Sequence, residues 1–157
     1  MSKENSVAAN EVRRLLRQAR GGSLATLDRD SGHPYASLVN VATDSTLRPI
    51  LFISSLAWHT RNLEKNPKAS LLVSEPGAVD DLAAARITVI GEFARNDDDE
   101  VRTGYLTHHP EARIYLDFAD FSFWLMKPER IHSIAGFGRI ETLDAKEVFH
   151  RPDVIKS

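Results

Sequence analysis

Segments rich in β-forming residues follow one another along most of this chain, and only short helical stretches separate them. Strands and helices do not alternate regularly, which argues against a parallel sheet of the doubly wound type. Six or more strands with short helical inserts instead fit a small antiparallel barrel, so the predicted fold class is mainly β. The expected strands cover residues 23–27, 35–42, 49–55, 68–74, 86–94, 121–126 and 131–143, the last of them interrupted by the glycines at 136 and 138.

Helical stretches are expected at four places between and around these strands. The opening helix has apolar residues at the i, i+3, i+4, i+7 spacing of a buried stripe and ends at a glycine pair. A second helix follows the strand that ends at Ser55 and stops before Pro67. Two more begin near Asn96 and at Pro110. The apolar stripe of the first helix consists of Val12, Leu15, Leu16 and Ala19.

The length of 157 residues corresponds to one ordinary domain, so we expect a single domain over 1–157 with tails at 1–7 and 145–157. Twenty basic residues against 22 acidic ones argue against a nucleic-acid partner. No apolar run approaches the ~20 residues that cross a bilayer, and no secretory signal opens the chain, so we expect no membrane association. A cytoplasmic protein is the simplest interpretation.

Metal sites and nucleophilic catalysis receive little support. The chain has no cysteine, which excludes disulfides, thiolate zinc sites and a cysteine nucleophile. The acidic run 96–100 lacks the glycine and final glutamate of a calcium loop, so we interpret it as the first turn of a helix whose amides it caps. No histidine pair has zinc spacing, and no Ser-His-Asp triad can be argued. We therefore expect no metal and name no catalytic residue.

The stretch 54–63 carries the clearest chemical signal. A strand ends in the hydroxyls of Ser54 and Ser55, a helix begins, and His59 and Arg61 follow within about two turns. Helix amides, hydroxyls and a guanidinium all suit an anion, so together they predict a phosphate cradle. In the alternative interpretation, Ser55 is only a helix cap and Arg61 a solvated surface residue.

Four motifs invite recognition: 54–67 with its HTRNL and closing NP, 85–92, 109–121 and 136–139. The first two resemble the flavin-phosphate stretch and following strand of the pyridoxamine 5'-phosphate oxidase-like, FMN-binding split-barrel family. The last two resemble its haem-utilisation branch. The likeness covers residues 8 to 143. It implies a six- or seven-stranded antiparallel split β-barrel with short flanking helices, and a homodimer with flavin or haem at its interface.

The resemblance also implies a set of cofactor-binding positions and a function. FMN is the expected cofactor, with haem as the alternative, and an FMN-dependent oxidoreductase is the expected class; a haem-binding protein and a flavin sensor without turnover stay open. His59 stands where many members have a phosphate-binding lysine, and Arg86 where the oxidases have a glutamine. The oxidases' C-terminal substrate pattern is missing, so vitamin B6 oxidation is not expected. The implied cofactor-binding residues are Ser37, Val39, Ser54, Ser55, His59, Thr60, Arg61, Asn62 and Arg86.

Overall fold

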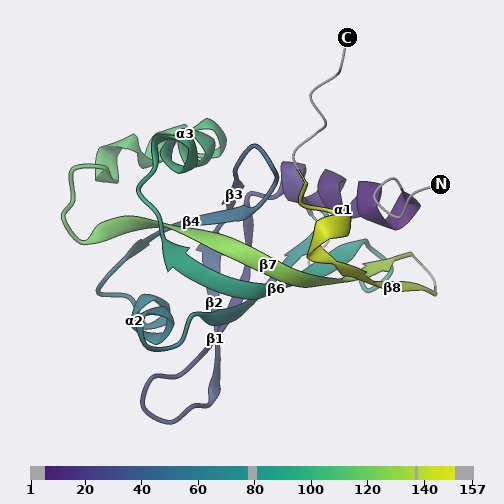
Figure 1. Cartoon of the computed structure of the whole chain (residues 1–157), viewed down its shortest axis with the longest axis horizontal. Coiled ribbons are helices and arrows are strands. Elements are labelled where there is room, and N and C mark those ends of the chain that lie inside the picture. The colour runs from purple at the N-terminus through teal and green to yellow at the C-terminus, as the bar shows by residue number, and fades with distance from the viewer. Residues whose placement is uncertain (1–5, 78–80, 137, 151–157) are drawn as a thin grey trace.

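The computed structural model describes residues 6–77, 81–136 and 138–150 and forms one curled antiparallel sheet (Figure 1). The strand order is β2-β1-β5-β6-β7-β4-β3, and β8 pairs with β7. The mainly β antiparallel split barrel predicted from the sequence is therefore confirmed, with eight strands where six or seven were expected. The strands are β1 (Gly21–Leu27), β2 (Pro34–Asn40), β3 (Ala42–Thr43), β4 (Pro49–Ser54), β5 (Lys68–Ser74), β6 (Arg86–Arg95), β7 (Phe121–Ala135) and β8 (Arg139–Asp144). The helices are α1 (Val7–Gln18), α2 (Trp58–Lys65), α3 (Asp99–His108) and two 3₁₀ helices, η2 (Pro110–Tyr115) and η3 (Ala145–Glu147).

Helices cover the concave face of the sheet in two places. The predicted apolar stripe of α1 is confirmed: Val12, Leu15 and Leu16 are each at most 1% exposed and pack into the main core. A second cluster lies under α3, where Tyr105 meets Phe52 and Phe123, whose rings stack with centroids 4.4 Å apart. The helix α2 lies beside the outer end of β1 and β2 (Figure 1), and its Leu63 reaches into the main core.

The strand β7 differs from the prediction because it runs through Pro128 without a break. A central strand disfavours proline, which lacks a ladder donor. Here the β6–β7 register shifts between Ile90 and Gly91, and the irregularity accommodates Pro128. A Cβ at position 91 would lie 2.3 Å from the Lys127 carbonyl oxygen, so only glycine fits. The expected strand 131–143 is divided at its glycines, as predicted, but its first part continues β7 and only its second part forms a separate strand, β8.

The first part of the segment expected as a C-terminal tail is packed against the rest of the protein. Its described part, 145–150, lies against α1 (Figure 1), and Val148 is 1% exposed. Arg13 of α1 donates from Nε to the Val148 carbonyl at 3.2 Å and from a terminal nitrogen to the Glu147 carbonyl at 2.7 Å. At the other terminus Ser6 caps α1, accepting from the Ala9 amide at 3.1 Å. The remaining residues of both expected tails lie outside the described part of the chain.

Two observations bear on membranes and metals. None of the helices in the described ranges is both long and apolar enough to cross a membrane. The acidic run leads into α3, which begins at Asp99 and has Asp98 at its N-cap position. The Asp98 side chain makes no capping hydrogen bond, so the expected capping role is not seen there, although Asp99 and Glu100 lie in the first turn. No cluster of potential metal ligands is found among the residues the structure describes.

Candidate functional site

The first turn of α2 is open to an anion. The N-cap residue is Ala57, not Ser55, and it offers no side-chain oxygen. Among the described residues, no hydrogen bond reaches the backbone amides of Trp58, His59 or Thr60. The positive end of the helix dipole is therefore left without the capping side chain that most helices have.

The two serines before α2 have different roles. Ser54 Oγ donates to Asp120 Oδ2 at 2.7 Å and accepts from the Leu56 amide at 3.1 Å, so its hydroxyl already has partners. The Ser55 amide donates to the Asp120 carbonyl at 2.7 Å, while its side chain is exposed. Both contacts tie the β4–α2 connection to the start of β7. The predicted cradle therefore has fewer free hydroxyls than the sequence indicates, and Asp120 adds a negative charge beside it.

His59 turns toward β2. Its Nδ1 lies 3.1 Å from Ser37 Oγ, so these two candidate residues lie together in the structure. Burial lowers the pKa of His59 below its ordinary value of 6.5, so the ring is neutral at pH 7. Val39, two residues beyond Ser37, is 6% exposed and belongs to the core, so its side chain does not face a ligand from this protomer.

An aromatic pair that sequence reasoning missed stands beside His59. The Trp58 ring stacks on Tyr35 of β2, with centroids 5.3 Å apart and planes 7° from parallel. The indole N–H donates to Asp28 Oδ2 at 2.8 Å. The amide of Ser31 and the Trp58 indole are the largest of the donors that hold the pKa of Asp28 at about 2. Trp58 is nevertheless 57% exposed, so this fixed ring presents apolar surface to solvent.

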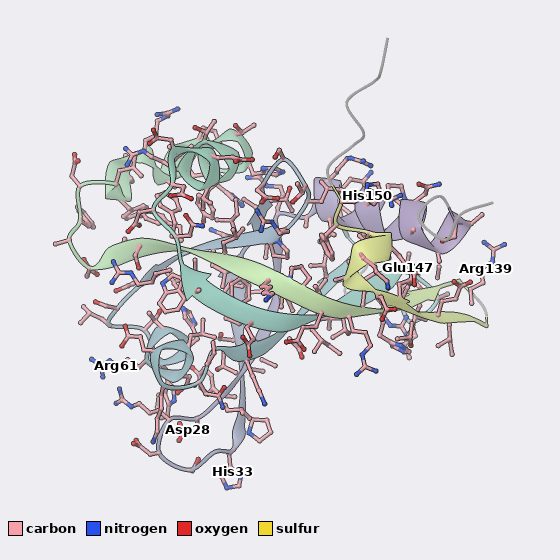
Figure 2. The ribbon with its side chains drawn as sticks, viewed as in Figure 1. Asp28, His33, Arg61, Arg139, Glu147 and His150 are labelled. Carbon is pink, nitrogen blue, oxygen red and sulfur yellow. The ribbon has the colours of Figure 1, made fainter. Side chains whose placement is uncertain are left out.

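Tyr35 and Ser37 alternate along β2 and so point to one face, the face that α2 meets. Strand alternation was therefore the available signal for Tyr35. Asp28 and Asp120 lie in loops and meet the site only through the fold. In Figure 2, Asp28 and Arg61 appear at the same end of the molecule, on the β1–β2 loop and on α2.

The next two predicted residues face inward. Thr60 is 1% exposed, and its Oγ1 is the one buried side-chain polar atom without a hydrogen-bond partner in the described ranges. Asn62 is fully buried: its Nδ2 donates to Thr26 Oγ1 at 3.0 Å, and its Oδ1 accepts from the Arg29 amide at 3.0 Å. The Asn62 amide is thus fully used in holding α2 against β1, which leaves it no atom for a cofactor.

Arg61 and Arg86 are far apart in this protomer. Arg61 lies on α2 with its Nε 3.4 Å from the Ser55 carbonyl oxygen, and it is partly exposed. Arg86 begins β6 and donates to the Leu82 carbonyl at 2.7 Å. Glu92, which pairs with Lys68 at the α2 end of the sheet, lies six residues along β6 from Arg86, a span of about 20 Å. The structure therefore does not bring Arg86 to the α2 site within one chain.

A cavity of about 570 Å³ lies at the opposite end of the molecule from α2. It is bounded by α1, the residues before β6, and the β7–β8 hairpin, and Glu11, Glu75 and Arg139 are among its lining residues. None of the predicted cofactor residues lines it. The cavity is therefore not the predicted cofactor site. The polar and aromatic residues described above lie instead on the open surface around α2.

The fold defines the class of protein. A structure from Clostridium acetobutylicum, described as related to general stress protein 26 and of the pyridoxinephosphate oxidase family, superposes with a TM-score of 0.67. At 16% identity, over 94% of this chain and 99% of that one, this match shows the fold alone. The protein therefore has the split β-barrel fold of that structure.

The chain belongs to the CREG β-barrel family, whose model matches residues 3–150. It is 38% identical over 130 residues to the chloroplastic non-canonical heme oxygenase HOZ of Arabidopsis thaliana, over 80% of this chain and 40% of that protein. It is 34% identical to a heme binding protein from Mycobacterium smegmatis, with a TM-score of 0.84 over 91% of this chain and 60% of that one. The chain thus spans about half the length of these two relatives.

Proposed function

We propose that this protein binds haem and that the haem lies against the first turn of α2. The composition of that turn carries the proposal: a neutral imidazole, a guanidinium two residues on, an exposed indole ring, and amides that find no partner in the described part of the chain. Haem combines a flat apolar ring with two carboxylates, so its site needs apolar surface next to a few donors. Trp58 and the 71% exposed Leu56 supply the apolar surface. Arg61 and the open end of the helix supply the donors.

The names of two relatives support the same ligand. Both the plant and the mycobacterial protein are named for haem, and each is more than 30% identical to this chain. Each is also longer than the part this chain matches, so their binding or activity comes to this protein as part of the proposal. The binding of haem, rather than its turnover, is what the residues around α2 support.

FMN is the second candidate. The open amides of α2 favour it, because phosphate binds readily at helix N-termini. Two features of this site weaken it relative to haem. The His59 ring is neutral where a lysine would carry a charge, and the Ser54 hydroxyl is bonded to Asp120. A phosphate, which carries more charge than one carboxylate, loses more from both features.

Titration of the purified full chain with ferric haem and, separately, with FMN tests the proposal. We expect a saturable Soret band with haem and no saturable quenching of flavin fluorescence with FMN. Quenching by FMN without a Soret band would replace haem by FMN as the ligand. Binding of neither molecule would contradict the proposal as a whole.

We also propose that the protein is a homodimer formed through the convex face of the sheet. The support comes from three exposed aliphatic residues on one face of the sheet: Leu38 of β2 is 84%, Leu72 of β5 42% and Ile90 of β6 38% exposed, with β1 between the first two. Leu38 and Leu72 both pair with Ser23 of β1, so they lie on one line across the sheet. Such an apolar strip on a sheet face is typical of an interaction surface.

Sedimentation equilibrium of the full chain and two variants tests the dimer. Leu38→Glu should lower the mass toward that of one chain, because it places a charge in the apolar strip. Leu82→Glu is the matched control, since Leu82 is 83% exposed but lies outside the strands, and it should keep the wild-type mass. A wild-type mass of 17.5 kDa at micromolar concentration would refute the dimer.

A further inference from the structure

We propose that His59 is the axial ligand of the haem iron, bound through Nε2 while Ser37 holds Nδ1. The inference rests on the haem site proposed above and goes beyond it by assigning the residue that contacts the metal. All six histidines of the chain lie in the described residues, so each can be compared as a ligand.

Three histidines are already engaged. His108 places Nδ1 3.0 Å from the Gly104 carbonyl oxygen and Nε2 3.5 Å from Thr43 Oγ1. His109 is 2% exposed, with Nε2 2.8 Å from the Val41 carbonyl oxygen and Nδ1 3.2 Å from Glu111. His150 faces a terminal nitrogen of Arg13 through Nε2 at 3.0 Å. Iron ligation by any of them would first have to break contacts that fix α3, η2 or the C-terminal segment.

The other three histidines differ in their surroundings. His33 is exposed at the tip of the β1–β2 loop, as Figure 2 shows. His132 places Nδ1 3.3 Å from Thr142 Oγ1 and lies on β7 in register with Thr88, with neither an exposed aromatic ring nor a helix end among its described contacts. His59 also has one ring nitrogen on a hydroxyl, but it stands in the open first turn of α2 beside Trp58. Among the described residues, no hydrogen bond reaches its Nε2.

The Ser37 contact has the form that an iron-bound imidazole needs. A ligating histidine uses the lone pair of one nitrogen and donates the N–H of the other to a nearby acceptor, which fixes the tautomer and the ring orientation. Ser37 Oγ can accept from Nδ1, and the lone pair then resides on Nε2.

The surroundings of His59 complete the assignment. Stacking on Tyr35 and the hydrogen bond to Asp28 fix the Trp58 ring, so its exposed surface is in place before a ligand binds. Arg61 starts from the other side of α2, two residues on, but its Nε reaches back to within 3.4 Å of the Ser55 carbonyl oxygen at the start of the helix, where it provides a cation for a haem carboxylate. A metal ligand, an apolar wall and a carboxylate partner thus come from one turn of one helix.

The test is a ferric haem titration of four full-length proteins followed by absorption and electron paramagnetic resonance. Wild type should give a histidine-ligated spectrum. His59→Ala should lose that spectrum, and added imidazole should restore it, because a free ligand can enter the vacated position. His132→Ala is the matched control and should retain it. Ser37→Ala should keep the spectral type but bind haem about 10–100-fold more weakly, as expected for loss of a partner of the ligand.

The outcomes separate this inference from the proposed function. If wild type binds no haem, the proposed function fails and the inference fails with it. If wild type binds haem and His59→Ala keeps the same spectrum, haem binding stands and the His59 assignment is overturned. A spectral loss in His132→Ala alone would move the ligand to β7. His59→Gln, which retains a polar side chain of similar length, repeats the test if His59→Ala does not fold.

Discussion

Two buried polar residues on α2 should respond in opposite directions to removal of their polar atoms. Asn62 is fully buried with both ends of its side-chain amide bonded, whereas the buried Thr60 hydroxyl has no partner among the residues that the structure describes. We therefore expect Asn62→Ala to destabilise the protein and Thr60→Val to leave it as stable or more stable. The pair isolates hydrogen bonding from burial, because both residues lie on the same short helix.

The magnitude follows from the groups left behind. Asn62→Ala leaves the Thr26 hydroxyl, 3% exposed, and the partly buried Arg29 amide without partners. Each such group costs about 1–3 kcal/mol, and the solvent near Arg29 favours the lower half of that range, so we expect a total of about 2–4 kcal/mol. Thr60→Val replaces an unpaired hydroxyl by a methyl of similar size and should stabilise by up to about 1 kcal/mol.

Urea unfolding followed by circular dichroism measures both effects as changes in the free energy of unfolding. An unchanged m value would show that both variants unfold from the same native state. A cost below about 1 kcal/mol for Asn62→Ala would refute the role of Asn62 in fixing α2. A Thr60→Val protein as unstable as Asn62→Ala would show instead that any change in this helix is costly, which would remove the argument from hydrogen bonds.

Three further predictions concern the site, the core and the sheet. Arg61→Ala should weaken haem binding about 10–100-fold in an absorbance titration by removing a charge-assisted pair, and unchanged affinity would mean that the carboxylates bind elsewhere. Burial raises the pKa of Tyr105 in the folded protein to about 12, above its ordinary value of 10. The contribution of the neutral phenol to stability is therefore complete below pH 10 and is lost as the pH rises toward 12. The free energy of unfolding of Tyr105→Phe, measured with urea, should therefore fall less steeply between pH 10 and 12 than that of wild type. Equal slopes would contradict the raised pKa of Tyr105. Gly91→Ala should lower Tm by several degrees in a thermal melt because its Cβ would meet the Lys127 carbonyl, and an unchanged Tm would show that the β6–β7 irregularity can relax.

Local patterns in the sequence were sufficient for most of the architecture. The apolar stripe of α1 and the β-forming runs predicted elements that the structure contains. The errors arose where distant residues decide the outcome. The strand β7 continues through Pro128 because Gly91 on a neighbouring strand makes room for it. The C-terminal segment lies on the core because Arg13 reaches Val148, 135 residues along the chain.

The candidate site divides in the same way. The placement of His59 and Arg61 on the first turns of a helix follows from local sequence, and the structure contains that helix. The partners that give the site its character are distant: Ser37 is 22 residues from His59, and Asp120 is 66 residues from Ser54. Arg86 matched a motif position, yet strand pairing places it at the other end of the sheet from α2. Motif spacing alone carries no information about such contacts.

A crystal structure of the protein with ferric haem, phased or checked with the anomalous signal of iron, tests the central claim most directly. We predict a single iron peak per chain next to the imidazole of His59, with the porphyrin against Trp58 and a haem carboxylate near Arg61. An iron peak beside His132 or in the cavity lined by Glu11, Glu75 and Arg139 would contradict the claim, because the first turn of α2 would then not be the haem site.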